Sequence, residues 1–284
     1  MTDKGSYTVD EIEHSGTPDK LTIRARSADL RAGLTQPRER SFHLHTLGDI
    51  VRSIAKQNDL TPAISDALET EAIDHLDQTN ESDANLLTRL AEQFGAVATV
   101  KQGQLLFIKA GDARSASGRP LPPVTITRQH GDSHRFNIAD REAYTGVKAY
   151  DQNTRKAEQQ TVEVKKQKPR NKPTQPDKGE ALADGTDNVK VLRHVYASKT
   201  NAERGAKAAW EKLQRGVAEF SITLAHGRPE LFPELPVTVQ GFKPVIDHAQ
   251  WIISRVTHSL GDGGYTMGVE LEVRVAGFGE GSTE

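Results

Sequence analysis

The sequence contains no cysteine, which excludes disulfide bonds, thiolate metal sites and a cysteine nucleophile, and which fits assembly in a reducing cytosol. Aromatic residues are also scarce, at 5% of the 284 residues, whereas 27% are charged and 35% are hydrophobic. This composition is polar for a globular chain, so it predicts a large surface or a disordered segment. The length is nevertheless sufficient for two domains with hydrophobic cores.

Strong net charge and long apolar runs are absent as well. Lysines and arginines number 37 against 39 acidic residues, and the resulting formal charge of -2 provides no global field to attract nucleic acid or an anionic membrane. No stretch approaches the length of a membrane span, and the first residues lack the apolar region of a signal peptide. We therefore expect a soluble protein with no nucleic-acid partner and no stable membrane binding.

The clearest local pattern is a capped helix within residues 73–111. Ser82 is a good N-cap, and the carboxylate of Asp83 suits the positive end of the helix dipole. Gly95 occupies the position where a left-handed residue would end the helix. An apolar stripe at helical period lies between these caps: Leu86, Leu87, Leu90, Ala91 and Phe94.

This helix belongs to a predicted α+β unit. Two runs rich in β-forming residues follow it, Val97–Val100 and Leu105–Ile108, joined by a connection of hairpin length. A second helix precedes it, predicted from Leu47 to Asn58, with Thr46 as its cap and Pro62 preventing its continuation. The helix between Ser82 and Gly95 therefore has a two-stranded sheet on which to pack.

Alternation of polar and apolar residues predicts strands on both sides of this unit. Residues 7–13 and 21–26 alternate around a turn-like link and predict a hairpin with Leu21, Ile23 and Ala25 on one face. Further strands are predicted downstream at Val124–Arg128, His134–Ile138, Thr145–Asp151 and Thr161–Lys165. Several short strands at short spacings are also predicted within residues 217–275, and such a succession favours a closed or nearly closed small barrel.

Residues 165–187 interrupt this order with no hydrophobic period, which predicts a solvated linker. The basic half of this segment could meet phosphates by charge alone, but no aromatic residues are interleaved with it. A third helix follows, in which Thr200 and Glu203 form the pattern of a capping box and Gly216 is the stop.

Three groups of residues could carry chemistry, and each has a plainer interpretation. His43 and His45 have the spacing that places two imidazoles on one strand face, but zinc needs at least a third protein ligand. Asp74, His75 and Asp77 could form a histidine oriented by a carboxylate, yet no nucleophile motif accompanies them. The run Gly261–Gly264 lacks the lysine and helix of a phosphate loop and is typical of a hairpin turn, while Trp210 and Trp251 are predicted core residues. We therefore assign no catalytic, cofactor-binding or metal-binding residue.

Two long stretches resemble a known family. The run TNESDANLLTRLAEQFG, with the hydrophobic hairpin after it, resembles the phage late control D family, the baseplate hub proteins of contractile, myovirus-type phage tails. Its pattern ESD-x-x-x-L-x-R-L is similar to one in the hub module of type VI secretion spike proteins. The stretches KLQRGVAEFSITLAHGRPELFPELPVTVQGFKPVID, WIISRVTHSL and GVELEV resemble the C-terminal half of the same family.

The resemblance implies a structural virion protein of a phage or prophage. It would be a homotrimeric hub that links the tail tube to the central spike and lies near the tape-measure protein. Its place would be the tail baseplate of the virion, after assembly in the host bacterial cytoplasm. In the family a further barrel segment precedes the first hairpin, so we expect this chain to be a shortened form whose first barrel lacks its N-terminal strands.

The predicted fold class is α+β, with two β-barrel-like domains and a helix-hairpin insert, the tail hub fold. The corresponding segments are 1–45 as strands of the first barrel, 46–110 as the α+β insert, 111–164 as further barrel strands, 165–187 as a disordered linker, 188–276 as the second β-barrel with one helix, and 277–284 as a tail.

The alternative is a tail-associated, cell-wall-degrading enzyme that hydrolyses peptidoglycan. A glycosidase needs two carboxylates placed across a cleft, and a peptidase needs a metal set or a triad. The sequence offers many acids but no such placement, so we predict that the protein is not an enzyme and has no cofactor.

Overall fold

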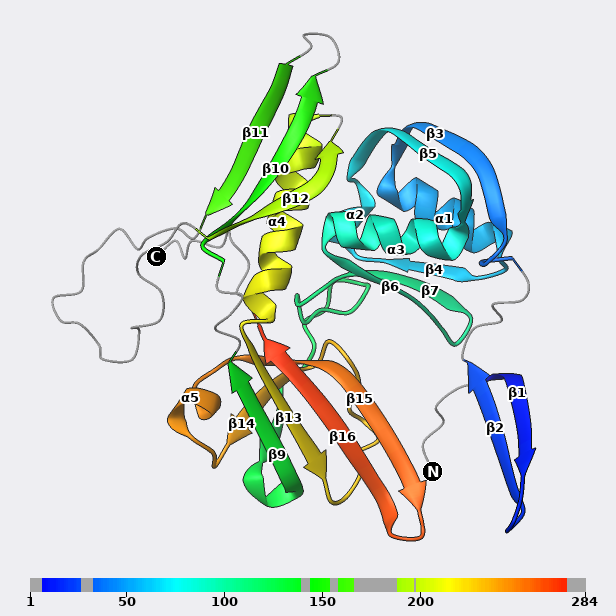
Figure 1. Ribbon diagram of the computed structural model, residues 1–284, viewed down its shortest axis with the longest axis vertical. Coiled ribbons are helices and arrows are strands. Elements are labelled where there is room, and N and C mark those ends of the chain that lie inside the picture. Colours follow the sequence, from blue (N-terminus) through cyan, green and yellow to red (C-terminus); the bar gives the residue numbers. More distant parts are fainter. Residues whose placement is uncertain are drawn as a thin grey trace, which may run out of the picture. The chain divides into compact units, whose positions relative to one another are not determined.

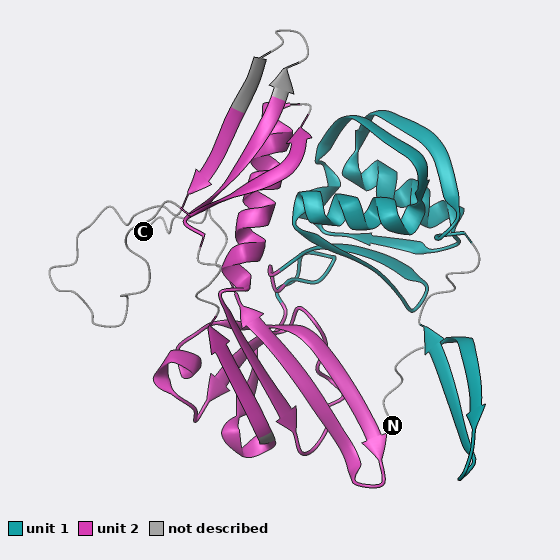
Figure 2. Ribbon diagram, viewed as in Figure 1, with its two compact units in different colours: residues 1–110, 114–120 teal, residues 111–113, 121–284 magenta. Residues whose placement is uncertain are grey.

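The computed structural model describes residues 7–26, 33–138, 144–153, 158–165, 188–196 and 198–274 (Figure 1). The chain divides into two compact units, one of residues 1–110 and 114–120 and one of residues 111–113 and 121–284 (Figure 2). The predicted linker, apart from Lys165, and the predicted tail 277–284 lie outside the described residues. No helix in the described part of the chain is both long and apolar enough to cross a membrane.

The two longer helices of unit 1, α1 and α3, lie between a two-stranded ribbon and a three-stranded sheet (Figure 1). The ribbon pairs β3 with β5 antiparallel, and the sheet has the order β4-β7-β6. Both helices contribute fully buried leucine or isoleucine side chains to one core with Phe42 of the ribbon and Phe107 of the sheet. The elements are β3 (Pro37–Thr46), α1 (Leu47–Gln57), β4 (Thr61–Ile64), α2 (Asp66–Glu69), β5 (Ala72–Ser82), α3 (Asp83–Phe94), β6 (Ala96–Lys101) and β7 (Gln104–Lys109).

The predicted caps of α1 and α3 are confirmed. Thr46 and Asp49 form a reciprocal capping box at the start of α1, although the sequence prediction named only Thr46. The Ser82 hydroxyl accepts a hydrogen bond from the Asn85 amide, and Gly95 ends α3 in the left-handed region with φ 61°. The helix and the hairpin that follows it are therefore present, while their role as an insert in a barrel stays a prediction.

A buried charge connects the start of α3 to the ribbon. The Asp83 side chain has no solvent exposure, and its carboxylate lies 2.5 Å from Arg40 Nη2 and 3.2 Å from Arg38 Nε. The amides of Asn58 and Gln78 donate to the same carboxylate at 3.1 and 2.9 Å. A buried carboxylate is tolerated only when it is paired in this way, so Asp83 joins β3, β5, α3 and the end of α1.

The first hairpin is also confirmed. β1 (Thr8–Ser15) and β2 (Lys20–Arg26) pair antiparallel, with Ile12 opposite Ile23, and form a two-stranded sheet of their own.

Unit 2 contains a six-stranded sheet of order β8-β14-β15-β16-β13-β9. β8 and β9 stand at opposite edges, yet only the 3-10 turn Arg128–His130 separates them in the chain. In a flat sheet these strands would be about 24 Å apart, because neighbouring strands are spaced by about 4.8 Å. The link can span at most about 15 Å, so the sheet must curl into a half-barrel. The strands are β8 (Val124–Thr127), β9 (Gly131–Ile138), β13 (Ala218–Leu224), β14 (Pro236–Gln240), β15 (Trp251–Gly261) and β16 (Gly264–Val273).

The curled sheet has its own hydrophobic core, and α5 (Pro244–Asp247) closes part of it. Trp251 is 1% exposed and donates its indole N–H to the carbonyl oxygen of Ile246 in α5 at 2.8 Å. The interpretation of Trp251 as a core residue is therefore confirmed.

A second module of unit 2 packs α4 (Lys199–Arg215) against a three-stranded sheet. β10 (Gly146–Asn153) is central, antiparallel to β11 (Glu158–Lys165) and parallel to β12 (Val189–Tyr196). Trp210 of α4 is 1% exposed in the core of this module, as predicted. At Gly205 a Cβ would lie 2.1 Å from the Tyr196 hydroxyl oxygen, so only glycine allows this close approach.

Two features differ from the sequence prediction. α4 starts at Lys199 with Ser198 as its N-cap, whereas Thr200 was predicted to cap it, because Ser198 also has the extended backbone and the acceptor that a cap needs. β8 and β9 pair with C-terminal strands, β11 pairs with β10, and β10 pairs with β12, so within the described residues none of the four pairs with β1 or β2 to complete a first barrel. Alternation predicts which residues of a strand share a face, but it does not identify the partner strand.

Candidate functional site

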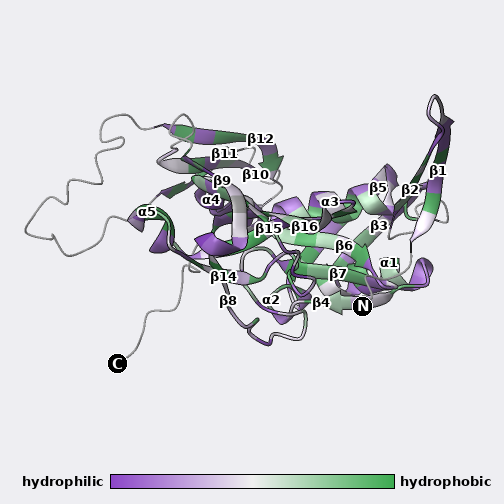
Figure 3. Cartoon of the chain, turned by 90° about the horizontal axis from the view of Figure 1, so that it is seen from below, coloured by the Kyte–Doolittle hydropathy of each residue, from purple (hydrophilic) through white to green (hydrophobic). Residues whose placement is uncertain are grey.

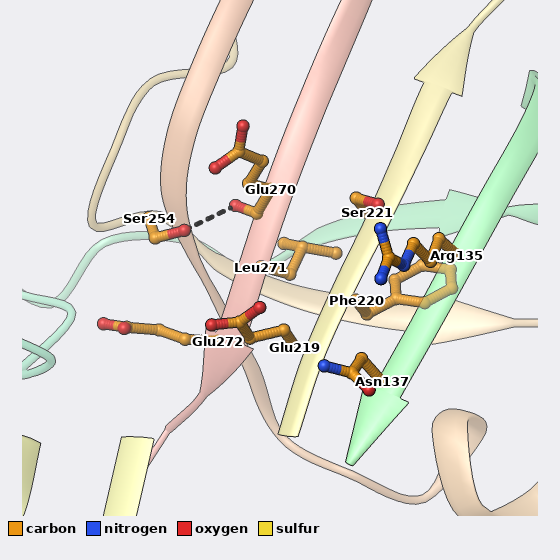
Figure 4. A pocket seen from close by; sticks show the side chains of 9 residues that line it. All are labelled: Arg135, Asn137, Glu219, Phe220, Ser221, Ser254, Glu270, Leu271 and Glu272. Carbon is orange, nitrogen blue, oxygen red and sulfur yellow. Dashed lines mark hydrogen bonds between the residues drawn. The ribbon is translucent and has the colours of Figure 1, made fainter. Parts of the chain in front are cut away.

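A polar hollow of about 290 Å³ lies on the six-stranded sheet of unit 2 (Figure 4). Its polar side chains come from neighbouring strands and lie on the face of the sheet away from Ile222 and Leu224, which point into the core. Its lining is Arg135 and Asn137 of β9, Glu219, Phe220 and Ser221 of β13, Ser254 of β15, and Glu270, Leu271 and Glu272 of β16.

Negative charge dominates this hollow. Glu219 stands directly opposite Glu272 in the strand register, an arrangement of like charges that is unfavourable by itself. Burial raises the pKa of Glu272, and the like charge of Glu219 raises it further. Arg215, whose Nε lies 3.2 Å from Glu272 Oε1, lowers the same pKa. The Ser254 hydroxyl donates to the backbone oxygen of Glu270 at 3.1 Å, so it is not held against a base as a nucleophile would be (Figure 4).

A second acidic group lies at the segment where the chain enters unit 2. The Glu234 carboxylate accepts a hydrogen bond from the Gly111 amide at 2.7 Å. Burial raises the pKa of Glu234 from 4.5 to about 7, although the Gly111 amide and Arg215 act in the opposite direction. The Arg274 guanidinium donates to the backbone oxygen of Asp112 at 3.2 Å, so the adjacent residues Gly111 and Asp112 are both held by side chains of unit 2.

The β1–β2 hairpin presents an exposed apolar surface. Leu21, Ile23 and Ala25 share one face of β2, as predicted, and the register sets Val9 and Ile12 of β1 beside them. The alternation of hydrophobic and hydrophilic residues along both strands is visible in Figure 3. The opposite face is polar and carries ion pairs from Arg24 to Glu11 and from Arg26 to Asp10. We call Val9, Ile12, Leu21 and Ile23, which are 41 to 66% exposed, the apolar hairpin face.

The histidines singled out in the sequence come together in an unexpected combination. His43 is paired with His75 of the neighbouring strand, at 3.1 Å between their Nδ1 atoms, rather than with His45. His45 instead contacts the backbone oxygen of His43 through its Nδ1 at 2.8 Å. His75 Nε2 lies 2.9 Å from Asp77 Oδ2, so a carboxylate does orient this histidine, although the sequence favoured a plain polar strand end here.

This cluster is not a catalytic triad. The Ser41 hydroxyl donates to the Asp77 carboxylate at 2.5 Å and not to an imidazole, so the histidine cannot take its proton. The described residues contain no group of three or more histidine, cysteine, aspartate or glutamate side chains suited to a metal ion. Gly261–Gly264 form the turn between β15 and β16, as the sequence indicated.

The sequence profile of the family "Phage tail baseplate hub (GPD)" matches residues 5–264. The chain belongs to this family. The hub protein is also 52% identical, over 97% of its own length and 77% of the relative's, to the probable baseplate hub protein of Escherichia phage 186. The resemblance to baseplate hub proteins that its motifs suggested is therefore confirmed.

Solved structures agree with the hub fold. A tail protein from Neisseria meningitidis MC58 matches 94% of the hub chain and 79% of its own, with TM-score 0.68 and 15% identity. A second match is the Escherichia coli c3393 protein, a component of the type VI secretion system. The match covers 94% of the hub chain and 60% of the c3393 chain, with TM-score 0.53 and 14% identity. These likenesses confirm a sheet-rich α+β fold shared by phage tails and the secretion system.

The hub chain is thus a structural component of a phage tail baseplate, and the peptidoglycan hydrolase alternative finds no support. Sequence reasoning missed Glu219, Glu234, Glu272 and the pairing of His43 with His75. The alternation in β13 does place Glu219 away from the core, but its acidic neighbours come from another strand.

Proposed function

We propose that the hub protein acts as a homotrimer that joins the tail tube to the central spike and meets the tape-measure protein. Membership of the baseplate hub family supports this role, and the apolar hairpin face is the observation that supports self-assembly. An isolated two-stranded hairpin is marginally stable in water, and it gains stability when an apolar face is covered. Full burial contributes about 1.5–3 kcal/mol for each large aliphatic side chain.

Light scattering on purified protein tests this assembly. The unchanged chain should run as a trimer at micromolar concentration, and Ile12→Asp should dissociate it because a carboxylate would be buried without a partner. The matched control is Glu13→Lys, which changes a charge on the next residue of the same strand. A monomeric wild type would contradict the trimer, whereas a trimeric Ile12→Asp would place the interface elsewhere.

We further propose that the protein has no enzymatic activity and that its role is confined to the assembled virion tail. The family is named for a structural part of the phage tail. The residues that line the acidic hollow include no serine paired with a histidine as nucleophile and base. A zymogram on peptidoglycan should show no cleared band at the mass of this chain. A cleared band that persists after Glu219→Gln and Glu272→Gln are combined would indicate an activity outside the hollow, and one that disappears would indicate an activity within it.

A further inference from the structure

The inference concerns the exposed imidazoles on the β3–β5 ribbon of unit 1. In the antiparallel register His43 stands directly opposite His75, so the two side chains extend from the same face. Their Nδ1 atoms are 3.1 Å apart and their ring centroids 4.6 Å apart. Two facing ring nitrogens can share one proton, or both can direct a lone pair at a cation between them.

The surroundings of His75 favour the second arrangement. Its Nε2 lies 2.9 Å from the Asp77 carboxylate. Because an ionised carboxylate only accepts hydrogen bonds, Nε2 bears the proton, and the Nδ1 of the neutral ring carries a lone pair. The Ser41 hydroxyl donates to the same carboxylate at 2.5 Å and holds it in place. A carboxylate that orients the far nitrogen of a metal-bound imidazole is the usual second layer of such sites.

The spacing of the two nitrogens fits one metal ion. At the usual bond length of about 2.0–2.1 Å to imidazole, an ion equidistant from two nitrogens 3.1 Å apart would subtend an angle of about 100°. That angle lies between the octahedral and tetrahedral values. The two rings are stacked with an interplanar angle of 30°, so each ring must turn about its side-chain bonds to direct its Nδ1 lone pair at the ion. We propose that His43 and His75 bind a divalent transition-metal ion of the zinc, nickel or copper class.

The site would be open. The His45 ring is held by its Nδ1 contact to the His43 backbone oxygen, and the described residues contain no group of three side chains suited to an ion. Solvent would complete the coordination sphere, so the ion exchanges readily and is unlike the enclosed ion of a four-ligand structural zinc site. Bound in this way, the ion would cross-link β3 to β5.

Calorimetric titration of the full chain with zinc chloride alone tests the proposal. We expect one ion per chain, a loss of at least tenfold in affinity in His43→Gln and in His75→Gln, and a weakening of about 10–100-fold in Asp77→Asn, which removes only the orienting carboxylate. The matched control is His45→Gln on the same strand, which should bind as the wild type does. All four positions are exposed, and circular dichroism without metal should confirm that each variant folds.

Copper provides a readout that a purely structural role would not change. Electron paramagnetic resonance of the chain with one equivalent of copper(II) should show coupling to two imidazole nitrogens in the wild type and to one in either single variant. Unchanged zinc affinity in both His43→Gln and His75→Gln would overturn the proposal, because the ion would then be adventitious at another histidine. Absence of zinc binding at millimolar concentration would also overturn it and leave only an imidazole hydrogen bond.

Discussion

Replacing Glu234 by glutamine should make the stability of unit 2 less dependent on pH. The side chain is only partly exposed and accepts the Gly111 amide at 2.7 Å, a bond that the glutamine carbonyl oxygen can also accept. Burial raises the pKa of Glu234 from 4.5 to about 7 in the folded chain. The substitution therefore keeps the shape and the hydrogen bond and removes only the titration.

The sign and size of the effect follow from proton linkage. Between pH 4.5 and about pH 7 the folded state binds more protons at Glu234 than the unfolded state, so the free energy of unfolding falls as pH rises. Each unit of pKa difference corresponds to about 1.4 kcal/mol, which sets an upper limit of about 3 kcal/mol for the whole range. Because the side chain is partly exposed, we expect about 1–2 kcal/mol after solvent screening.

Urea denaturation followed by tryptophan fluorescence at pH 5, 6, 7 and 8 measures this effect, since Trp210 and Trp251 are both buried in unit 2. The stability of Glu234→Gln relative to the wild type should increase with pH and level off above pH 7. Asp262→Asn, an exposed change in the turn between β15 and β16 of the same unit, is the control for removal of a carboxylate and should not reproduce this rise with pH. A pH-independent difference for Glu234→Gln would refute the reasoning.

The remaining predictions concern single buried contacts. Asp83→Asn should lower the stability of unit 1 by about 3–5 kcal/mol in urea denaturation, because it leaves Arg38 and Arg40 partly buried without a counter-charge; a loss below 1 kcal/mol would contradict the buried pair. Gly205→Ala should cost about 1–3 kcal/mol by thermal denaturation because its Cβ meets Tyr196, whereas Gly263→Ala, which meets nothing within 4 Å, serves as the neutral control. Equal melting temperatures for these two variants would show that α4 can shift away from Tyr196.

Local features of the fold could be predicted from the sequence. The caps of α1 and α3 depend on Thr46, Ser82 and Gly95, each of which acts within a few residues of its own position. The hairpin of β1 and β2 needs only alternation and a short turn. The family could be identified because long motifs persist in order along the chain, with residues 5–264 matching the family profile.

Contacts between distant segments were decided by the tertiary structure. β8 could have paired with any exposed strand edge, and its pairing with β14 follows from the curl of a sheet that contains both. His43 meets His75, and Glu234 meets Gly111, only because the folded chain brings together residues 32 and 123 positions apart. Periodicity records which side of an element is buried, whereas partner choice depends on packing energies summed over the whole core, which no local pattern contains.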